Sequence, residues 1–221
     1  MSQTRPRVRL PRSQRRAQLL RAAQDLFVEQ GYHATVMDQI AERAGVSKPV
    51  LYQHFPGKLE LYLAILDHHN TELVRSVSEA ATSEPVNKMK VAAAVDAYFA
   101  FVEADGAAFK LVFESDLTND PLVRDRVNSA ERQLATVVTD IIAEDTDLPR
   151  ASAELLGFAL STMAHASARN WLVHENPLPR QEAAALITQL AWRGIRAFPR
   201  AGEAPREGGG PDEQPGSAPI A

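Results

Sequence analysis

Residues 35–58, TVMDQIAERAGVSKPVLYQHFPGK, decide the fold of this chain. The stretch predicts two short helices joined by a tight turn and followed by the start of a third helix. Four apolar residues recur at helical spacing in its first half: Met37, Ile40, Ala41 and Ala44. That spacing makes one buried face. Gly45 stands where the chain must reverse, and glycine reaches positive φ without a Cβ clash.

Both short helices carry starting signals. We expect Thr35 to cap the first helix, with Asp38 three positions on completing a pair like a capping box. Ser47 can cap the second helix. Pro49 is tolerated in the first turn of that helix because amides there have no intrahelical partner.

The second short helix leaves polar residues facing outward: Lys48, Pro49, Gln53 and His54. Two packed helices with a glycine-bearing turn and an outward polar face form the geometry that places a recognition helix in a DNA major groove. The alternative is an ordinary αα-hairpin that binds nothing.

A longer stretch around this unit, LLRAAQDLFVEQGYHAT followed by IAERAGVSKPVLYQHFPGKLEL, resembles the DNA-binding domain of TetR-type transcriptional regulators. The matching residues are Leu19, Ala22, Ala23, Phe27, Gly31, Tyr32, Thr35, Ile40, Ala41, Ala44, Gly45, Val46, Ser47, Leu51, Tyr52, Phe55, Lys58 and Leu61. Pro49 departs from the pattern, since many members carry glycine there, and we expect it to alter base preference but not docking.

The resemblance implies a set of DNA-contacting residues: Thr35, Ser47, Lys48, Pro49, Tyr52, Gln53, His54 and Lys58. Within this set, Tyr52, His54 and Lys58 match positions that touch the DNA backbone. Since one such domain reads only a half-site, the partner is expected to be double-stranded DNA with a pseudo-palindromic operator, bound by a homodimer.

Charge is divided unevenly along the 221 residues, whose net charge is −4. Residues 1–60 hold ten lysines and arginines against five acids, a balance of +5, and the remainder holds 14 against 23, a balance of −9. A basic head for phosphates and an acidic body follow from this asymmetry.

Several function classes are excluded by what the sequence lacks. It has no cysteine, which rules out disulfides, thiolate chemistry and cysteine-bound metals. Its start lacks the apolar core of a secretory signal, and no run approaches membrane-spanning length. We therefore expect a cytoplasmic protein with no membrane partner.

The chain divides by composition into four parts. Residues 1–12 form a basic arm that either contacts DNA or is merely solvated, and residues 13–60 form the helix–turn–helix domain, with its motif at about 36–55. Residues 61–198 form a helical effector-binding and dimerisation domain. Residues 199–221 are rich in glycine and proline and are expected to be disordered.

The predicted fold class is all-α, because no strand-like alternation appears anywhere. A three-helix DNA-binding domain precedes a helical body, giving about nine helices in total. Among their boundaries, Asp120-Pro121 predicts an N-cap followed by proline in the first turn. The segment AAFKLVFES predicts one short helix of the body.

The last two long helices carry small and apolar side chains at helical spacing. In TetR-like proteins these helices form a four-helix bundle with their copies in the second subunit, and the residues predicted for that interface are Ala159, Met163, Ala183, Ile187, Leu190 and Ala191. The alternative is that these stripes only close the core of one chain.

The resemblance also implies an effector pocket among the middle helices. The candidate ligand-binding residues are Asp96, Phe99, Phe113, Thr162, His165 and Trp171. Aromatic residues at this spacing are more often plain core, and the polar ones can equally serve structure or face solvent.

Enzymatic function and metal binding find little support in the sequence. Ser161 and His165 stand four residues apart on one helix, but nothing suggests an oxyanion hole or a third orienting group. His68 and His69 are adjacent, so they point to different sides of a helix rather than at one metal. We expect no enzyme, metal or cofactor.

The prediction is a dimeric, sequence-specific DNA-binding transcriptional regulator. The favoured form is a repressor that a small, largely apolar ligand releases from its operator. The alternative is a DNA-binding regulator with no small-molecule ligand, controlled by a partner protein or by abundance.

Overall fold

The computed structural model describes residues 10–104, 106, 117, 119–173 and 178–195, and all regular elements in this part of the chain are α-helices. The predicted all-α class is therefore confirmed. Eight helices lie within the described residues. The short helix predicted at AAFKLVFES falls outside them, as do the first nine residues and the tail beyond residue 195.

Three helices form the head of the molecule: α1 (Arg12–Ala34), α2 (Met37–Arg43) and α3 (Lys48–His54). They enclose an apolar core with Leu19, Ile40 and Leu51 fully buried at its centre. The two glycines singled out in the sequence both have positive φ. Gly31 (81°) breaks the helical path near the end of α1, and Gly45 (63°) makes the turn between α2 and α3.

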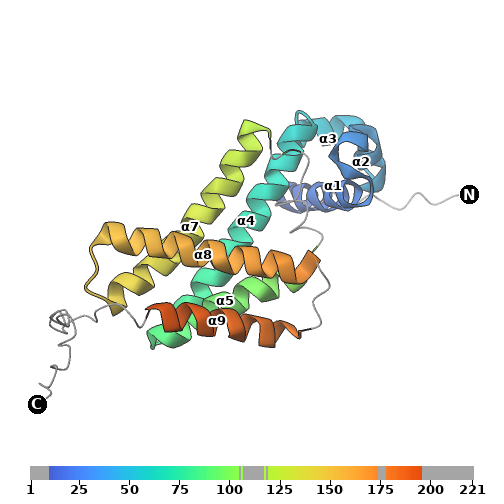
Figure 1. The fold of residues 1–221 in the computed structure, drawn as a ribbon. Helices are drawn as coiled ribbons and strands as arrows, with labels where there is room; N and C mark the ends of the chain where they lie inside the picture. The colour runs from blue at the N-terminus through green and yellow to red at the C-terminus, as the bar shows by residue number, and fades with distance from the viewer. Residues whose placement is uncertain (1–9, 105, 107–116, 118, 174–177, 196–221) are drawn as a thin grey trace, which may run out of the picture.

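Two long helices, α4 (Lys58–Thr82) and α7 (Pro121–Asp145), run from the head into the body (Figure 1). The cap predicted at Asp120 is confirmed, because its carboxylate accepts hydrogen bonds from the amides of Leu122 and Val123. The side chain of Val123 is fully buried in the same apolar cluster as the core of the head. Both helices therefore belong to head and body at once.

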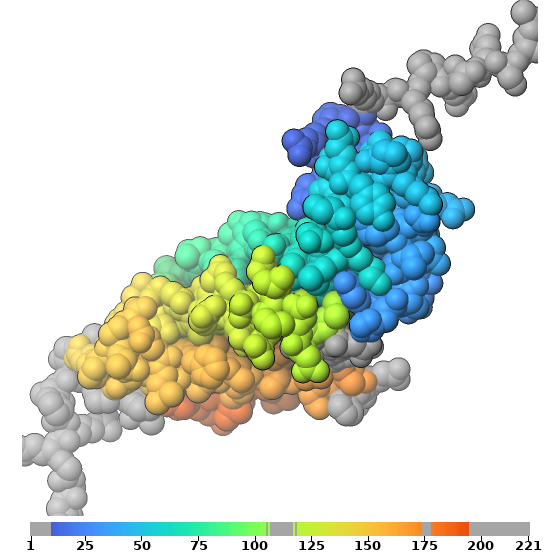
Figure 2. All heavy atoms as spheres, turned by 90° about the horizontal axis from the view of Figure 1, so that it is seen from above, coloured from blue at the N-terminus to red at the C-terminus, as the bar shows by residue number. Residues whose placement is uncertain are grey.

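The body is completed by α5 (Asn87–Ala104), α8 (Arg150–Val173) and α9 (Arg180–Ile195). In Figure 1, α8 lies above α9, and both helices run across the body. The packing of α8 on α7 depends on Gly157, where an added Cβ would stand 2.2 Å from Oγ1 of Thr139. The space-filling view shows an elongated molecule with the head at one end (Figure 2).

No helix in the described part of the chain is long and apolar enough to cross a membrane.

Candidate functional site

The outward face of the head is built on α3. Leu51 anchors this helix with a fully buried side chain, while Lys48, Pro49, Tyr52 and Gln53 are exposed on it. Ser47 occupies the N-cap position and is also exposed, but its side chain makes no capping hydrogen bond. The helix thus presents side chains with donors and acceptors to the surface while its apolar side is held in the core.

An exposed ion pair orients the start of α3. Lys48 Nζ lies 2.5 Å from Oδ2 of Asp38 on α2, and both side chains are more than half exposed. Exposed pairs of this kind contribute little to stability. The Lys48 ammonium can therefore leave Asp38 for another anion at small cost.

A basic cluster that the sequence analysis did not assign to the site extends this face. Arg16 lies over the ring of Phe55, 4.5 Å from its centroid. His54, at the end of α3, has its pKa lowered by burial and then by the nearby positive charges of Arg12, Arg16 and Arg15. The sequence signal for this cluster was the run of arginines at the start of the first helix.

The N-cap predicted at Thr35 is wrong. Its side chain is fully buried, and its hydroxyl donates to the carbonyl of Gly31 at 2.8 Å. The N-cap of α2 is Val36, whose amide donates to Gln39 Oε1 at 3.0 Å. Because the chain leaves its helical path at Gly31, the carbonyl of Gly31 needs a donor, and the Thr35 hydroxyl supplies it rather than capping α2.

Lys58, predicted to contact phosphate, is held inside the joint between head and α4. Its Nζ donates to the carbonyls of Tyr32 and Thr35, both at 2.7 Å, and to that of His33 at 3.3 Å. Burial lowers the pKa of this ammonium.

The body contains an apolar cavity of about 50 Å³ between α4, α5, α7, α8 and α9. It is lined by Val77, Val91, Ala94, Val95, Tyr98, Leu134, Val138, Ile141, Leu160, Ser161, Met163, Ala164, Ile187 and Ala191. Two of the five helices, α4 and α7, are those that reach the head.

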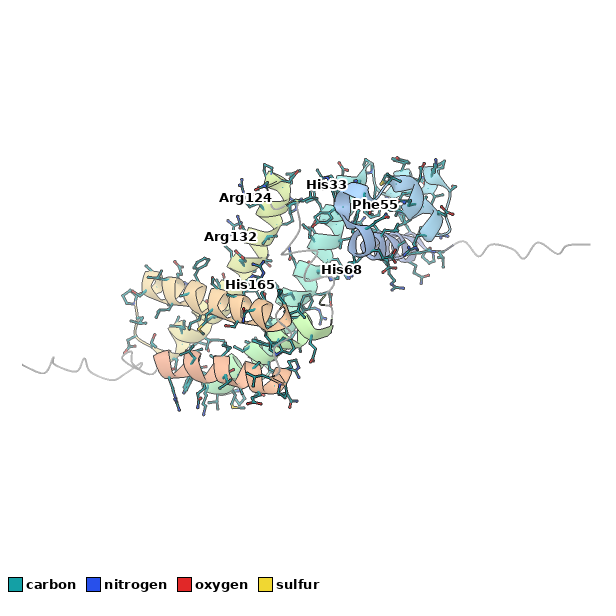
Figure 3. The ribbon with its side chains drawn as sticks, turned by 45° about the vertical axis from the view of Figure 1, so that its right-hand side comes forward. His33, Phe55, His68, Arg124, Arg132 and His165 are labelled. Atoms are coloured by element: carbon teal, nitrogen blue, oxygen red, sulfur yellow. The ribbon has the colours of Figure 1, made fainter. Side chains whose placement is uncertain are left out.

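A buried pair provides the polar end of this cavity. The hydroxyl of Tyr98 lies 2.7 Å from Nδ1 of His165 on α8, which Figure 3 places in the body, far from Phe55 in the head. Burial lowers the pKa of His165, and the charge of Arg169 lowers it further. Burial also raises the pKa of Tyr98, with Glu131 as a second cause. Both side chains are therefore neutral at pH 7.

Of the predicted pocket residues that the structure describes, none is among the residues that line this cavity, and their role in ligand binding stays a prediction. Asp96 is ion-paired with Arg180. Phe99 is core, packed on Trp171 with ring centroids 5.9 Å apart. Thr162 is exposed. Phe113 lies outside the described residues. Periodicity identified the helices of the cavity but not which face of each helix turns toward it.

Trp171 and His165 have structural partners at the edge of this region. The indole nitrogen of Trp171 donates to the carbonyl of Leu178 at 2.9 Å, which joins the end of α8 to the start of α9. His165 contacts the cavity through Tyr98, which is one of the lining residues.

The predicted dimer residues divide into two groups. Ala183 and Ala191 are buried within their own chain, and Met163 and Ile187 line the cavity and are partly buried. The dimer role of all six residues stays a prediction. Ala159 and Leu190 are exposed. A set of large apolar side chains is exposed with them on α8 and α9: Leu155 (70%), Phe158 (51%), Leu186 (50%) and Leu190 (60%). We call these four the α8–α9 seam.

Within the described residues, no group of three or more histidine or acidic side chains is arranged to hold a metal ion. His68 is exposed on α4, while the buried His69 bonds Gln24 on α1 at 2.9 Å.

The fold and the exposed face of α3 define a helix–turn–helix DNA-binding protein. The sequence model described as "Bacterial regulatory proteins, tetR family" matches residues 19–65. FasR of Mycolicibacterium smegmatis, named an HTH-type transcriptional activator, is 44% identical over 86% of this chain and 87% of its own. The chain belongs to the TetR family of bacterial transcriptional regulators, which confirms the resemblance stated above.

Solved structures agree with this assignment. A TetR-like regulator from Rhodococcus sp. RHA1 matches with a TM-score of 0.67 and 28% identity, covering 85% of this chain and 99% of that one. FadR of Bacillus subtilis, solved in complex with stearoyl-CoA, matches with a TM-score of 0.65 and 18% identity, covering 79% and 96%. At that identity the second likeness shows the fold alone.

Proposed function

We propose that this protein is a dimeric transcriptional regulator whose affinity for its operator is lowered by a ligand with a long apolar chain. The observation that carries the proposal is the position of the apolar cavity. Two of its walls, α4 and α7, are also the helices that enter the head. A ligand that moves either wall therefore moves the DNA-reading face.

The exposed residues of α3 are proposed to contact the DNA. Lys48, Pro49 and Gln53 would face base edges in the major groove, with Tyr52 and His54 on the phosphates. Arg12 and Arg16 would add phosphate contacts at the start of α1. Phosphate contacts fix the register of the protein on the duplex, and base-edge contacts select the sequence.

The dimer is proposed to form through the α8–α9 seam. Four large apolar side chains lie exposed there on neighbouring helices, with Ala159 between them on α8. A second copy of this chain is the occupant that the DNA-reading mode requires, because one head reads one half-site. Two copies related by a two-fold axis would bury the same seam on both sides.

The chemistry of the cavity favours a ligand with an uncharged carbonyl on an apolar chain. None of its lining residues carries a charge, and its polar groups are the hydroxyls of Tyr98 and Ser161. When His165 donates its Nδ1–H to the Tyr98 oxygen, the neutral Tyr98 hydroxyl can donate its own hydrogen bond to a ligand. A carboxylate ligand would be buried there without a counter-charge among the described lining residues, which is costly. An acyl ester or thioester fits both conditions.

One protein of the same fold has been solved with a ligand of this class. FadR of Bacillus subtilis was solved with stearoyl-CoA, a long-chain acyl thioester. Its likeness to this chain shows the fold alone, so the ligand proposal rests on the residues that line the cavity here.

Ligand entry must widen the cavity. At about 50 Å³ it is far smaller than the roughly 300–1,000 Å³ of pockets that hold drug-sized ligands. Helices must part to admit a long chain, and α4 and α7 are among them. Since half-sites lie roughly 34–36 Å apart, a shift of a few ångströms in head spacing loses one of them.

The direction of regulation is proposed from the similarity to FasR, which is named an activator and aligns over 87% of its length. We therefore favour an activator over the repressor that the sequence analysis favoured. In either case the ligand lowers operator occupancy. The position of the operator relative to the promoter decides whether bound protein activates or represses transcription.

The test is operator binding with and without an acyl thioester. Operator DNA is first selected from random duplexes, and its affinity is then measured with palmitoyl-CoA, palmitic acid or neither. The proposal requires the thioester to weaken binding and the free acid to have little effect. Stable DNA binding that neither compound alters would favour control by a partner protein or by abundance.

A further inference from the structure

The apolar cavity of the body has a polar end and an apolar end. Tyr98 and His165 mark the polar end with their hydrogen bond. Ser161 also lines the cavity, but its hydroxyl already donates to the carbonyl of Phe158 at 3.0 Å. Among the described lining residues, Tyr98 is therefore the one placed to donate to the carbonyl of a bound thioester. The acyl chain must then run away from Tyr98.

An ion pair between α5 and α7 locates the opposite end of the cavity. Lys90 near the start of α5 pairs with Glu144 near the end of α7. Val91, the next residue of α5, and Ile141, one turn before Glu144, both line the cavity. They therefore lie together at the end away from Tyr98. Val91 precedes Tyr98 by seven residues, which corresponds to roughly 10 Å along a helix.

This distance limits the chain that the cavity can hold between its two ends. An extended acyl chain advances about 1.3 Å per carbon, because its C–C bonds of about 1.5 Å form a zigzag. An octanoyl chain therefore spans about the distance from Tyr98 to Val91. A palmitoyl chain is about twice as long, so it must continue beyond the apolar end.

Leu160 on α8 stands where a longer chain would continue. It is partly buried and lines the cavity. It also packs against two core clusters at once: the large cluster around the cavity, and a small cluster with Ile142 and Ala153 buried at its centre. Ile142 is near the end of α7 and Ala153 near the start of α8. Leu160 therefore separates the cavity from further apolar core.

Val138 on α7 borders the same small cluster and also lines the cavity, but it is a fixed wall. Valine is β-branched, so in a helix its side chain is held in one preferred χ1 rotamer. Leucine branches at Cγ, and in a helix it adopts either of two χ1 rotamers. Of these two side chains, that of Leu160 is the one that can turn aside for a chain.

We propose that Leu160 determines the chain length of the ligand, because it must turn aside before a chain longer than about eight carbons can pass it. Such a chain would continue toward Ile142 and Ala153. The inference rests on the proposed function, since it takes the ligand to be an acyl thioester with its carbonyl at Tyr98. It adds a specificity-determining residue to that site.

Two substitutions of Leu160 have opposite expected effects. Leu160→Ala removes the side chain that must move, so a long chain enters more easily. Leu160→Ile keeps the number of carbons but moves the branch to Cβ, which fixes χ1 in a helix and prevents the side chain from turning aside. Exchange of leucine for isoleucine usually costs little stability, so this second variant is expected to fold.

The experiment compares octanoyl-CoA with palmitoyl-CoA on the full-length protein. Affinity for each thioester is measured by calorimetry, and operator release by fluorescence anisotropy. Since a methylene in an apolar pocket discriminates by about tenfold or more, we expect Leu160→Ile to bind palmitoyl-CoA about tenfold more weakly than the native protein. Its affinity for octanoyl-CoA should be unchanged. Leu160→Ala should shift the preference toward palmitoyl-CoA.

Leu134→Ile is the matched control. Leu134 lines the cavity on α7 at the polar end, one turn after Glu131, whose charge acts on Tyr98. The same exchange there should alter the affinity for both thioesters alike. The inference is overturned if both Leu160 variants keep the native ratio of the two affinities, or if Leu134→Ile changes that ratio as much as Leu160→Ile does.

Binding and operator release together separate this inference from the proposed function. Thioesters that bind with a preference controlled by Leu160, yet leave operator affinity unchanged, would sink the proposed regulation and support the chain-length role. Operator release by both thioesters with no effect of the Leu160 variants would do the reverse. If the native protein binds neither thioester, both proposals fall.

Discussion

Single residues in the head show how burial decides between two roles for the same residue type. Lys48 and Lys58 lie ten positions apart, yet one is exposed beside a carboxylate and the other is enclosed by carbonyls and a ring. Thr35 and Ser47 differ in the same way, since the first is buried against Gly31 and the second is exposed. A sequence motif marks all four positions alike, and only the packing shows which side chains are already bonded within the head.

His54 gives a pH dependence to DNA binding. Its pKa is lowered in the free protein, by burial first and by Arg12, Arg16 and Arg15 next, so it is neutral at pH 7. A phosphate placed beside it would raise that pKa, because an opposite charge favours the protonated form. DNA binding then takes up a proton, and affinity rises as pH falls below about 7.

The measurement is operator affinity between pH 5.5 and 8 for the native protein and His54→Gln. We expect the native protein to gain affinity toward acidic pH by more than the variant does. Parallel pH profiles would remove His54 from the phosphate contacts.

At the scale of helices, the sequence predicted most of the architecture. Asp120-Pro121 and Gly45 act through the local backbone, so their roles could be predicted without knowledge of the fold. Which side of α8 and of α9 faces the core could not be predicted in this way. Both helices have apolar residues on more than one face, and whether Ala191 or Leu190 points inward depends on where α5 and α7 lie. The pocket residues were missed for the same reason.

The contact between α4 and α7 contains a buried polar group that is only partly hydrogen-bonded among the described residues. Asn70 is buried on α4 and donates to the carbonyl of Arg126, but its Oδ1 has no hydrogen-bond partner among the described residues. An unsatisfied buried acceptor costs about 1–3 kcal/mol. Leucine has a similar volume and no polar atom, so Asn70→Leu should raise the free energy of unfolding by about 1 kcal/mol.

Thermal and denaturant unfolding of Asn70→Leu measure this difference. Asn87→Leu is the matched control, because the Asn87 amide donates to Asp145 and has a partner to lose. We expect the control to be neutral or destabilised. Destabilisation of Asn70→Leu would mean that Oδ1 is satisfied in solution, for instance by a buried water.

At the scale of the whole molecule, the acidic body and the basic head are joined by α4 and α7 (Figure 1). The seam, the cavity and the head then form a series along the molecule. In the proposed dimer, assembly through the seam would set the distance between the two heads, and a ligand in the cavity would change that distance.

Leu190→Glu tests the assembly. The side chain is 60% exposed in a single chain, so the substitution should leave the fold intact while placing a charge in the apolar seam of the dimer. Burying an unpaired charge costs several kcal/mol. We expect a folded monomer with greatly weakened operator binding, by analytical ultracentrifugation and fluorescence anisotropy. Gln189→Glu, at the exposed position just before Leu190, serves as the charge-matched control. A Leu190→Glu dimer would show that the seam lies elsewhere.

The central claim is that a ligand's acyl chain in the cavity lowers the affinity of the two heads for the operator. The ratio of operator affinities with and without saturating palmitoyl-CoA tests this claim most directly. The ratio is measured for the native protein and for Ala164→Phe, whose larger side chain fills the cavity at a buried position of α8. Coupling between sites typically amounts to about 1–3 kcal/mol, so the native protein should bind its operator about 5–150-fold more weakly with the thioester. Ala164→Phe should bind DNA and show a ratio near one. A thioester that binds the native protein and leaves its operator affinity unchanged would contradict the account.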